Sequence, residues 1–275
     1  MGRSCLLAPD DPVGGGLGTK ETRVRWRPHP REELAAAVST VYRGTMSEFE
    51  VGALEGRIAV ERHGAGDPLV LTHGFGDSAE TWTELRPVLS EQYETWSWDL
   101  LGHGRSARPT SKSEYSLQIA LADLEAMIRA PGRDVVLIGH SLGGYLSQYR
   151  CATSLEGIRA LVLIATGPGF RSETKRERWN DFIYKGAGRY DVPDAAMRMA
   201  EMHDDHVMAN LEKIAIPTLL ICGDRDVQYH SALDVYKERI PVVESVIVPD
   251  AKHHVHRSHA PEVGAQILSF LEGLD

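Results

Sequence analysis

Short apolar runs alternate with longer amphipathic stretches along most of the chain from Pro68 onward. Apolar runs of this length, bounded by Gly, Pro or Asp, predict buried strands, and apolar residues recurring every three or four positions predict helices. Strands are expected at residues 68–74, 93–100, 134–140, 158–165, 216–223 and 243–250, and helices at 81–91, 116–130, 142–154, 231–240 and 261–274. This repeated order indicates right-handed βαβ units and a mostly parallel sheet covered by helices on both faces.

Two intervals depart from this rhythm. Residues 46–64, MSEFEVGALEGRIAVERHG, alternate apolar and polar positions, which predicts a two-stranded hairpin that turns near Glu55 and Gly56. Residues 166–213 contain no strand pattern and favour several helices. An insertion of that length is more typical of a lid than of an idle loop, so we expect a lid over about residues 167–213. Four methionines of this insertion either pack it onto the body or form an adaptable ceiling over a pocket: Met197, Met199, Met202 and Met208.

The first 45 residues differ from the rest of the chain. They are rich in Gly, Pro and charged residues and, apart from a possible short helix at residues 31–42, lack helix or strand periodicity. This composition is typical of disorder. We therefore expect residues 1–45 to be a disordered extension, and residues 46–275 to form the folded domain, with Met46 as the natural start.

Composition narrows the classes of partner. The formal net charge of -9 argues against nucleic acid, which binds a basic face. No apolar run reaches the roughly 18 residues of a membrane helix, and the start of the chain lacks the apolar segment of a secretory signal, so we expect a cytoplasmic protein without a membrane partner. Three scattered cysteines make no disulfide framework, and Cys151 and Cys222 are expected to be buried thiols. The oligomeric state stays open.

The apolar run that begins at Val135 ends in Gly139-His140-Ser141-Leu142-Gly143, and a helical pattern follows. A Gly-x-Ser-x-Gly sequence between strand and helix makes a sharp turn with strained geometry at the serine, because a Cβ on either glycine would collide with nearby backbone. The turn exposes the hydroxyl at the carboxyl edge of the sheet and at a helix N-terminus. A plain glycine-rich turn would have the same letters, so the partners of Ser141 decide between the two interpretations.

A serine hydroxyl needs a neighbouring base, usually a histidine, which in turn needs a carboxylate to orient it. Downstream of Ser141, the strand that ends in CGDRD supplies Asp224 and Asp226, and the last strand is followed by the histidine-rich segment AKHHVHRSH. The order serine, aspartate, histidine is one that nature uses for such a triad. The corner is therefore predicted to be catalytic.

With these residues in place, the chain from residue 48 to 275 resembles the α/β-hydrolase superfamily. Five motifs match in order: HGFGDS (73–78), DLLGHGRS (99–106), GHSLGG (139–144), GDRD (223–226) and the histidine-rich segment with Pro261. The resemblance implies an α/β-hydrolase fold, with a mostly parallel eight-stranded sheet flanked by helices and a short helical lid after the sixth strand.

The resemblance also assigns roles. Ser141 is implied to be the nucleophile, and Asp226, three residues after the glycine of GDRD, the acid, which leaves Asp224 to the turn. Family members place the base seven residues before the proline of the last helix, which selects His254. His253 remains the alternative, because it occupies a position that usually holds glycine.

Further positions follow from the same motifs. The backbone N–H groups of Phe75 and Leu142 are implied to form the oxyanion hole, and Gly74, Phe75 and His140 to line the substrate site. His73 is expected to brace its loop, and Asp99 with His103 to form a structural turn.

No metal and no cofactor are expected. His253, His254, His256 and His259 lie on one loop, where the histidines of HHVH would give poor tetrahedral geometry.

The predicted chemistry is hydrolysis of a small to medium carboxylic ester or thioester, through acylation of Ser141. A serine at the elbow excludes the dehalogenases and epoxide hydrolases of this fold, which use an aspartate. Carbon–carbon bond hydrolases usually carry a tryptophan after the catalytic histidine, and Val255 follows His254 here. Alternatives are a carbon–carbon bond hydrolase, a lactonase, an amidase or an acyltransferase, or, in a different class, a non-catalytic receptor for a small molecule.

Overall fold

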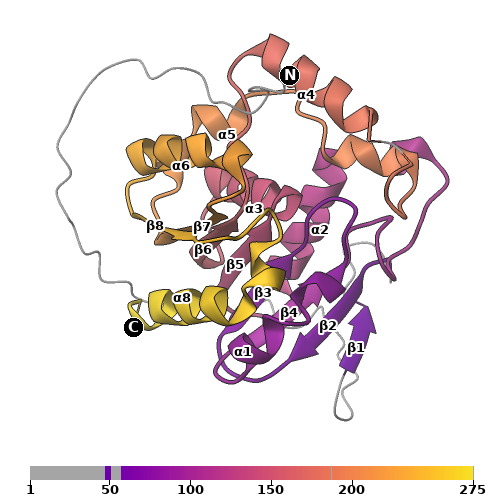
Figure 1. Ribbon diagram of the computed structural model, residues 1–275. Helices are drawn as coiled ribbons and strands as arrows, with labels where there is room; N and C mark the ends of the chain where they lie inside the picture. The colour runs from indigo at the N-terminus through magenta and orange to yellow at the C-terminus, as the bar shows by residue number, and fades with distance from the viewer. Residues whose placement is uncertain (1–46, 51–56, 187, 275) are drawn as a thin grey trace.

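The computed structural model describes residues 47–50, 57–186 and 188–274. Their centre is an eight-stranded sheet with the order β1-β2-β4-β3-β5-β6-β7-β8 (Figure 1). β1 pairs antiparallel with β2, and β2 with β4, whereas all other neighbours are parallel. The strands are β1 Ser47–Glu50, β2 Ala59–His63, β3 Pro68–Thr72, β4 Glu94–Trp98, β5 Val135–His140, β6 Ile158–Ile164, β7 Thr218–Gly223 and β8 Val243–Val248. The predicted α/β-hydrolase fold is confirmed.

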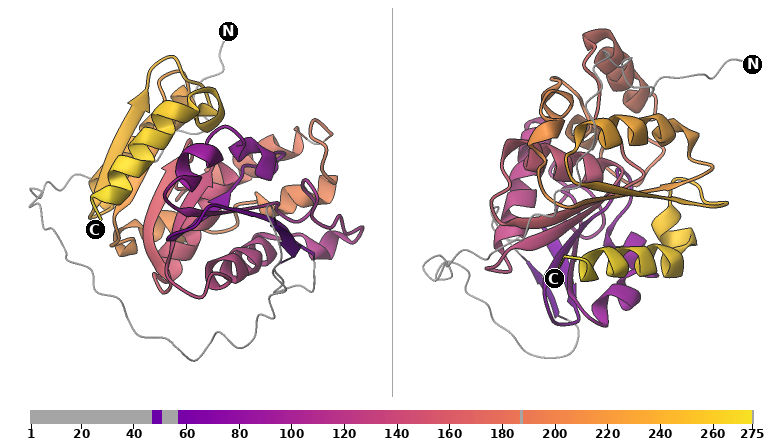
Figure 2. Two further views of the ribbon diagram at one scale, coloured as in Figure 1. Left: turned by 90° about the horizontal axis from the view of Figure 1, so that it is seen from below. Right: turned by 90° about the vertical axis from the view of Figure 1, so that its left-hand side faces the viewer.

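Helices cover both faces of the sheet. The right-hand view of Figure 2 shows α1 and α8 on one side and α3 and α6 on the other. The longer helices are α2 Leu117–Arg129, α3 Leu142–Thr153, α4 Glu173–Tyr184, α6 Val227–Arg239 and α8 Ala260–Glu272. The shorter ones are α1 Arg86–Ser90, α5 His206–Ala209 and α7 Val255–Ser258, with 3-10 turns η2 Ala79–Trp82, η3 Lys112–Glu114, η4 Asp194–Met199 and η5 Leu211–Lys213.

Strand β5 explains why the apolar runs in this chain do not alternate with polar residues. Val135 and Leu137 belong to the apolar cluster on one side of the sheet, and Val136 and Ile138 to the cluster on the other. Successive side chains of a strand point to opposite faces, so a strand covered by helices on both faces must be apolar throughout. The two clusters hold the sheet edge where β5, β7 and β8 end, which positions the loops that follow them.

The segment between β6 and β7 carries α4, η4, α5 and η5, and α4 lies at the top of Figure 1. No strand interrupts its described residues, as the sequence predicts. The four methionines of this segment are at most 8% exposed: Met197, Met199, Met202 and Met208. Three of them, Met199, Met202 and Met208, belong to the larger apolar cluster. They therefore fasten the insertion to the body of the domain.

Two helix predictions need correction, and one short helix, α7, was not predicted. The helix expected at 81–91 is divided into η2 and α1, since Pro87 starts a new helix where its missing N–H is harmless. Helix α6 begins at Val227 rather than near residue 231, because its first residues are exposed or half-buried and show no apolar period. Helix α7 was not predicted, because its four residues are too few to show an apolar period.

Some predictions concern residues outside the described ones. The antiparallel pairing of β1 with β2 confirms the hairpin, although its predicted turn near Glu55 is not described. The predicted disordered extension at residues 1–45 and the short helix at 31–42 also lie outside the described residues. Cys151 and Cys222 are free and buried, as expected.

Candidate active site

The sharp turn between β5 and α3 places Ser141 at the carboxyl edge of the sheet. Ser141 has φ 51° and ψ -114°, a backbone conformation that costs energy in a residue with a Cβ. A Cβ on Gly139 would lie 2.5 Å from the carbonyl oxygen of Gly143, and one on Gly143 would lie 2.1 Å from the carbonyl oxygen of Thr72. The glycines are therefore required by close backbone approach, as the sequence predicts.

An aspartate and a histidine meet near this turn. Nδ1 of His253 lies 2.8 Å from Oδ2 of Asp226. A carboxylate can only accept, so Nδ1 carries the proton and Nε2 of His253 is left with its lone pair. Asp226 is 8% exposed and directly precedes α6, whereas Asp224 is exposed and shows no hydrogen bond to His253 among the described residues. Of the two candidates for the acid, the structure brings Asp226 to a histidine.

The histidine beside Asp226 is His253, and not the expected His254. His254 is exposed, and its Nε2 lies 3.7 Å from Oδ2 of a different carboxylate, Asp77. Counting seven residues back from Pro261 selects His254, but His253 is eight residues before it. The extra residue is accommodated by the turn of α7 before α8 begins at Ala260. The geometry therefore favours the alternative, His253, over His254 as the histidine that pairs with Asp226.

Tyr229 was not expected at the site. Its ring is stacked on that of His253, with centroids 5.2 Å apart and planes 20° apart. Its hydroxyl lies next to the side chain of Ser141. Burial raises the pKa of Tyr229, so the phenol is neutral. Tyr229 lies in the first turn of α6, three residues beyond Asp226. The residues of this turn show no helical period, so only a correct start for α6 could have placed Tyr229 at the site.

Tyr229 thus lies against both Ser141 and His253. Among the described residues, the side chain of Ser141 contacts Tyr229 and shows no hydrogen bond to His253. Contacts of this kind often form only when substrate is bound.

The loop after β3 lies against the serine. A Cβ on Gly74 would come within 3.1 Å of the Ser141 Cβ, so the loop backbone passes directly beside the nucleophile position. Phe75 packs edge-on against His103 and Tyr190. Within the described residues, the N–H groups of Phe75 and Leu142 have no backbone acceptor. Both donors remain available to a ligand next to Ser141.

His73 braces this loop, as predicted. Its Nε2 lies 2.9 Å from the backbone N of Leu100 and therefore accepts, so its Nδ1 donates to the carbonyl of Gly74 at 2.7 Å. The ring is fully buried, and burial lowers the pKa of His73, which keeps it neutral. The bond ties the loop after β3 to the end of β4.

Asp99 and His103 form a structural turn, also as predicted. The carboxylate of Asp99 accepts from the backbone N–H groups of Ala79 at 2.6 Å and Arg105 at 2.9 Å. Burial lowers the pKa of His103 to about 3, so this imidazole is neutral. Neither residue contacts Ser141 in the described contacts.

His140, expected at the substrate site, is buried and bonded to the backbone of the histidine-rich segment. It is 1% exposed, and its Nε2 donates to the carbonyl of His253 at 3.0 Å. It is surrounded by three further imidazoles, whose centroids lie 4.2 Å (His256), 4.8 Å (His253) and 5.1 Å (His254) away. His140 is the last residue of the buried strand β5, and its buried side chain supports the backbone of His253.

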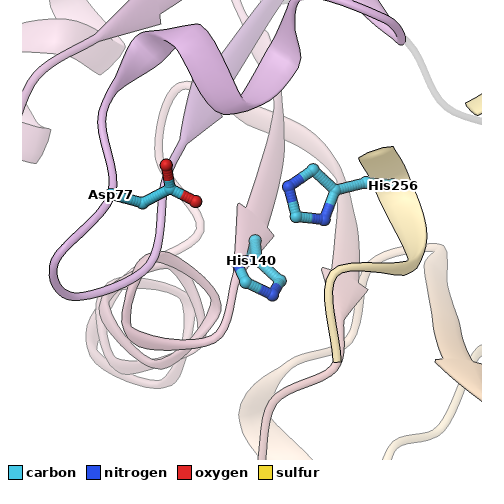
Figure 3. Close-up of side chains that lie close together, drawn as sticks. All are labelled: Asp77, His140 and His256. Atoms are coloured by element: carbon cyan, nitrogen blue, oxygen red, sulfur yellow. The ribbon is translucent and has the colours of Figure 1, made fainter. Parts of the chain in front are cut away.

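Figure 3 shows Asp77, His140 and His256 close together, from three separate segments. One donor atom of each lies within 4.8 Å of the others. Burial lowers the pKa of both His140 and His256 well below its ordinary value, so both rings are neutral. Residues that could hold a metal are therefore drawn from across the fold, and only His256 comes from the histidine-rich segment considered in the sequence.

Comparison with known proteins identifies the family of the chain. The family model described as "Alpha/beta hydrolase family" matches residues 69–266. A protein of Bacillus subtilis named "Putative 2-succinyl-6-hydroxy-2,4-cyclohexadiene-1-carboxylate synthase" is 27% identical over 260 residues, which cover 79% of this chain and 94% of that protein. A "Pimeloyl-[acyl-carrier protein] methyl ester esterase" of Aeromonas hydrophila is 31% identical over 122 residues, 44% of this chain and 45% of that protein.

Solved structures share the fold. An esterase from Exiguobacterium antarcticum matches with a TM-score of 0.69 at 19% identity, covering 84% of this chain and 100% of that one. A bromoperoxidase from Bacillus anthracis matches with a TM-score of 0.68 at 22% identity, covering 83% and 100%. In the part of the chain that the structure describes, no helix has both the length and the apolar character to span a membrane.

Proposed function

Since the chain belongs to the alpha/beta hydrolase family, we propose that it is a serine hydrolase that cleaves a small to medium carboxylic ester or thioester through an acyl-enzyme on Ser141. One observation carries the proposal: the buried Asp226 fixes the tautomer of His253 at the same sheet edge where Ser141 is held in a strained turn. A buried carboxylate beside a histidine, next to a strained serine, is an arrangement suited to nucleophilic catalysis.

The proposed first step begins with the Ser141 hydroxyl leaving Tyr229 and turning to Nε2 of His253. The hydroxyl oxygen attacks the carbonyl carbon, its proton passes to Nε2, and the carbonyl π bond becomes a tetrahedral oxyanion. Asp226 stabilises the resulting imidazolium through its bond to Nδ1. Collapse of the oxyanion expels the alcohol or thiol, which takes the proton from His253, and leaves the acyl group on Ser141. Water then attacks the ester, with His253 accepting its proton, and releases the acid.

The N–H groups of Leu142 and Phe75 are the proposed donors to the oxyanion. Leu142 is the first residue of α3, where the helix dipole favours negative charge, and the Phe75 loop passes beside Ser141. Removal of one such donor typically costs about 3–4 kcal/mol of transition-state stabilisation. Gly74 contributes by leaving room, since a Cβ there would press on Ser141.

The inserted segment, about residues 167–213, is the proposed lid over this site, and the domain is proposed to extend over residues 46–275. The guanidinium of Arg176 donates to the backbone carbonyls of Phe170 and Arg171, just before α4 begins. That engagement favours an uncharged acyl group over an anionic one. An ester substrate also agrees with the esterase that the comparison found, whose name specifies a methyl ester.

A fluorophosphonate probe tests for the nucleophile. The wild-type chain is expected to be labelled, and Ser141→Ala is expected to abolish labelling while circular dichroism shows that it still folds. A folded wild-type protein that resists the probe would favour the non-catalytic receptor. Equal labelling of wild type and Ser141→Ala would place the reactive group elsewhere.

Substrate class is tested with p-nitrophenyl esters of increasing chain length, alongside a thioester and a lactone. We expect kcat/KM to be greatest for short to medium acyl groups. His254 follows His253, so the tryptophan typical of carbon–carbon bond hydrolases is absent at that position too. Labelling by the probe without turnover of any of these substrates would instead favour acyl transfer or carbon–carbon bond chemistry.

A further inference from the structure

Three buried polar atoms converge beside the proposed active site and have no hydrogen-bond partner. They are Oδ2 of Asp77, Nδ1 of His140 and Nδ1 of His256. Donor atoms of these residues lie within 4.8 Å of one another, and Figure 3 shows the side chains turned toward a common space. An unpartnered buried polar atom costs roughly 1–3 kcal/mol. Three such atoms in one place indicate that something occupies the space between them.

The hydrogen bonds of His140 fix which of its atoms faces this space. Its Nε2 lies 3.0 Å from the carbonyl oxygen of His253, and a carbonyl only accepts, so Nε2 carries the proton. In a neutral imidazole, Nδ1 is then a bare lone pair. A histidine that donates one N–H to a backbone carbonyl and presents the other nitrogen is the usual arrangement of a metal ligand.

The other two residues are held in a similar way. Nε2 of His256 lies 2.8 Å from the hydroxyl of Thr81, and His256 is fully buried. Oδ1 of Asp77 accepts from the backbone N–H of Ser78 at 3.0 Å, which leaves Oδ2 for the common space. Each side chain is thus anchored through one polar atom and presents its second one.

Two further residues border these three atoms. A Cβ on Gly74 would lie 2.9 Å from Nδ1 of His140, so a larger residue there would press on the lone pair. His254 adds a fourth donor at the rim, since its Nε2 lies 3.7 Å from Oδ2 of Asp77. Among the hydrogen bonds of the described residues, none joins Asp77, His140 and His256 to one another.

We propose that Asp77, His140 and His256 form a binding site for a divalent transition metal, of which Zn²⁺ fits best. Two neutral imidazoles and one carboxylate are the ligand set of many zinc sites that keep a fourth position open, and His254 or water would fill that position. Zn²⁺ holds nitrogen and oxygen ligands at about 2.0–2.2 Å, so tetrahedral binding requires the cluster to contract by about 1 Å.

The site joins three segments that the proposed function depends on. Asp77 belongs to the loop after β3, His140 to the turn that holds Ser141, and His256 to the segment that holds His253. A bound ion would fasten these segments together from the interior side. Its role is therefore structural, and the inference does not depend on the proposed hydrolase activity.

Metal content and affinity test the site directly. The full chain is stripped with a chelator and titrated with ZnCl₂ by calorimetry, and with Co²⁺ by visible absorption. We expect one tightly bound equivalent, and absorption bands typical of four-coordinate Co²⁺. Asp77→Asn and His256→Gln should each weaken binding at least about 100-fold, and Thr81→Val about 10- to 100-fold through the orientation of His256.

His203→Gln is the matched control, because Nε2 of His203 lies 2.9 Å from Oε2 of Glu201 on the surface and offers a competing adventitious site. This control should bind Zn²⁺ as the wild type does. Loss of binding in His203→Gln but not in His256→Gln would overturn the proposal.

Crystals of the wild type soaked in Zn²⁺ give a result even if a variant fails to fold. An anomalous peak at the zinc edge between Asp77, His140 and His256 supports the site. Water or nothing in that position, at a zinc concentration that saturates the calorimetric titration, overturns it. None of these measurements uses turnover, so failure of the metal site and failure of the proposed function are distinguishable.

Discussion

The phenol ring of Tyr229 is stacked on the imidazole of His253 with centroids 5.2 Å apart, and its hydroxyl contacts Ser141. One side chain therefore reaches both groups that the proposed mechanism must bring together. The ring limits rotation of His253, whose Nδ1 is already held by Asp226. In the absence of substrate, the Tyr229 hydroxyl lies next to the side chain of Ser141.

Separate variants of Tyr229 should distinguish these two effects. Aromatic pairs contribute about 0.5–1.5 kcal/mol, so Tyr229→Ala should lower kcat about 2- to 10-fold through looser placement of His253. Tyr229→Phe keeps the ring and should keep kcat within about 2-fold, since the lost hydroxyl contact belongs to the resting enzyme. Ester hydrolysis measured over a range of substrate concentration decides. A loss in Tyr229→Phe as large as that in Tyr229→Ala would show that the hydroxyl, and not the ring, matters.

His253→Ala and His254→Ala test the assignment of the base. Loss of a general base typically costs about 10²–10⁴-fold, so His253→Ala should lose at least that much in kcat/KM. His254 is exposed and has no contact with Asp226 among its described contacts, so His254→Ala should stay within about 10-fold of the wild type. Steady-state hydrolysis of a p-nitrophenyl ester measures both. The opposite ranking would return the role to His254.

The choice of His254 over His253 from the sequence has a specific physical origin. The glycine turn at Ser141 and the order of strands could be predicted, because each depends on local backbone geometry or on apolar period. The choice between two adjacent histidines depends on how many residues lie between β8 and α8. That number includes the turn of α7, whose four residues carry no periodic signal. A shift of one residue was enough to exchange His253 for His254.

The position of His140 and the cluster around it could not be predicted from the sequence, for a different reason. Asp77 and His256 are separated along the chain by most of the domain, and only the order β3-β5-β6-β7-β8 brings the ends of these strands together. The sequence showed several histidines in one segment. It did not show that His256 faces inward against Thr81 while its neighbour His254 faces solvent.

Gly143→Ala should destabilise the domain strongly. Its Cβ would lie 2.1 Å from the carbonyl oxygen of Thr72, which belongs to a central strand and cannot move without disturbing the sheet. Overpacking of this kind costs about 1–3 kcal/mol or more. Gly167→Ala is the control, because its Cβ would meet nothing closer than 3.7 Å and its φ is not positive, so we expect little loss and up to about 1 kcal/mol of gain. Urea unfolding of both variants checks the ranking, and equal stabilities would contradict it.

The last prediction concerns Asp123, a carboxyl group of α2 that is 2% exposed and has no hydrogen-bond partner for either oxygen. Burial raises the pKa of Asp123 from its ordinary value of 3.8 to about 7, and the positive charge of Arg57 offsets only part of this shift. Between these two pH values the folded chain holds a proton that the unfolded chain has lost. Stability must therefore fall as the pH rises through this window, and the loss is complete above the folded pKa.

Asp123→Asn removes this titration while keeping the shape of the side chain. From about pH 5.5 to 8, the wild type should lose about 2 kcal/mol of unfolding free energy that the variant does not lose, at 1.36 kcal/mol for each pH unit below the folded pKa. Urea unfolding of both proteins at several pH values measures the difference, and the shared titration of all other groups cancels between them. Parallel pH profiles would mean that Asp123 is charged in the fold. In that case a counter-charge, with Arg57 as the candidate, must compensate the burial of Asp123.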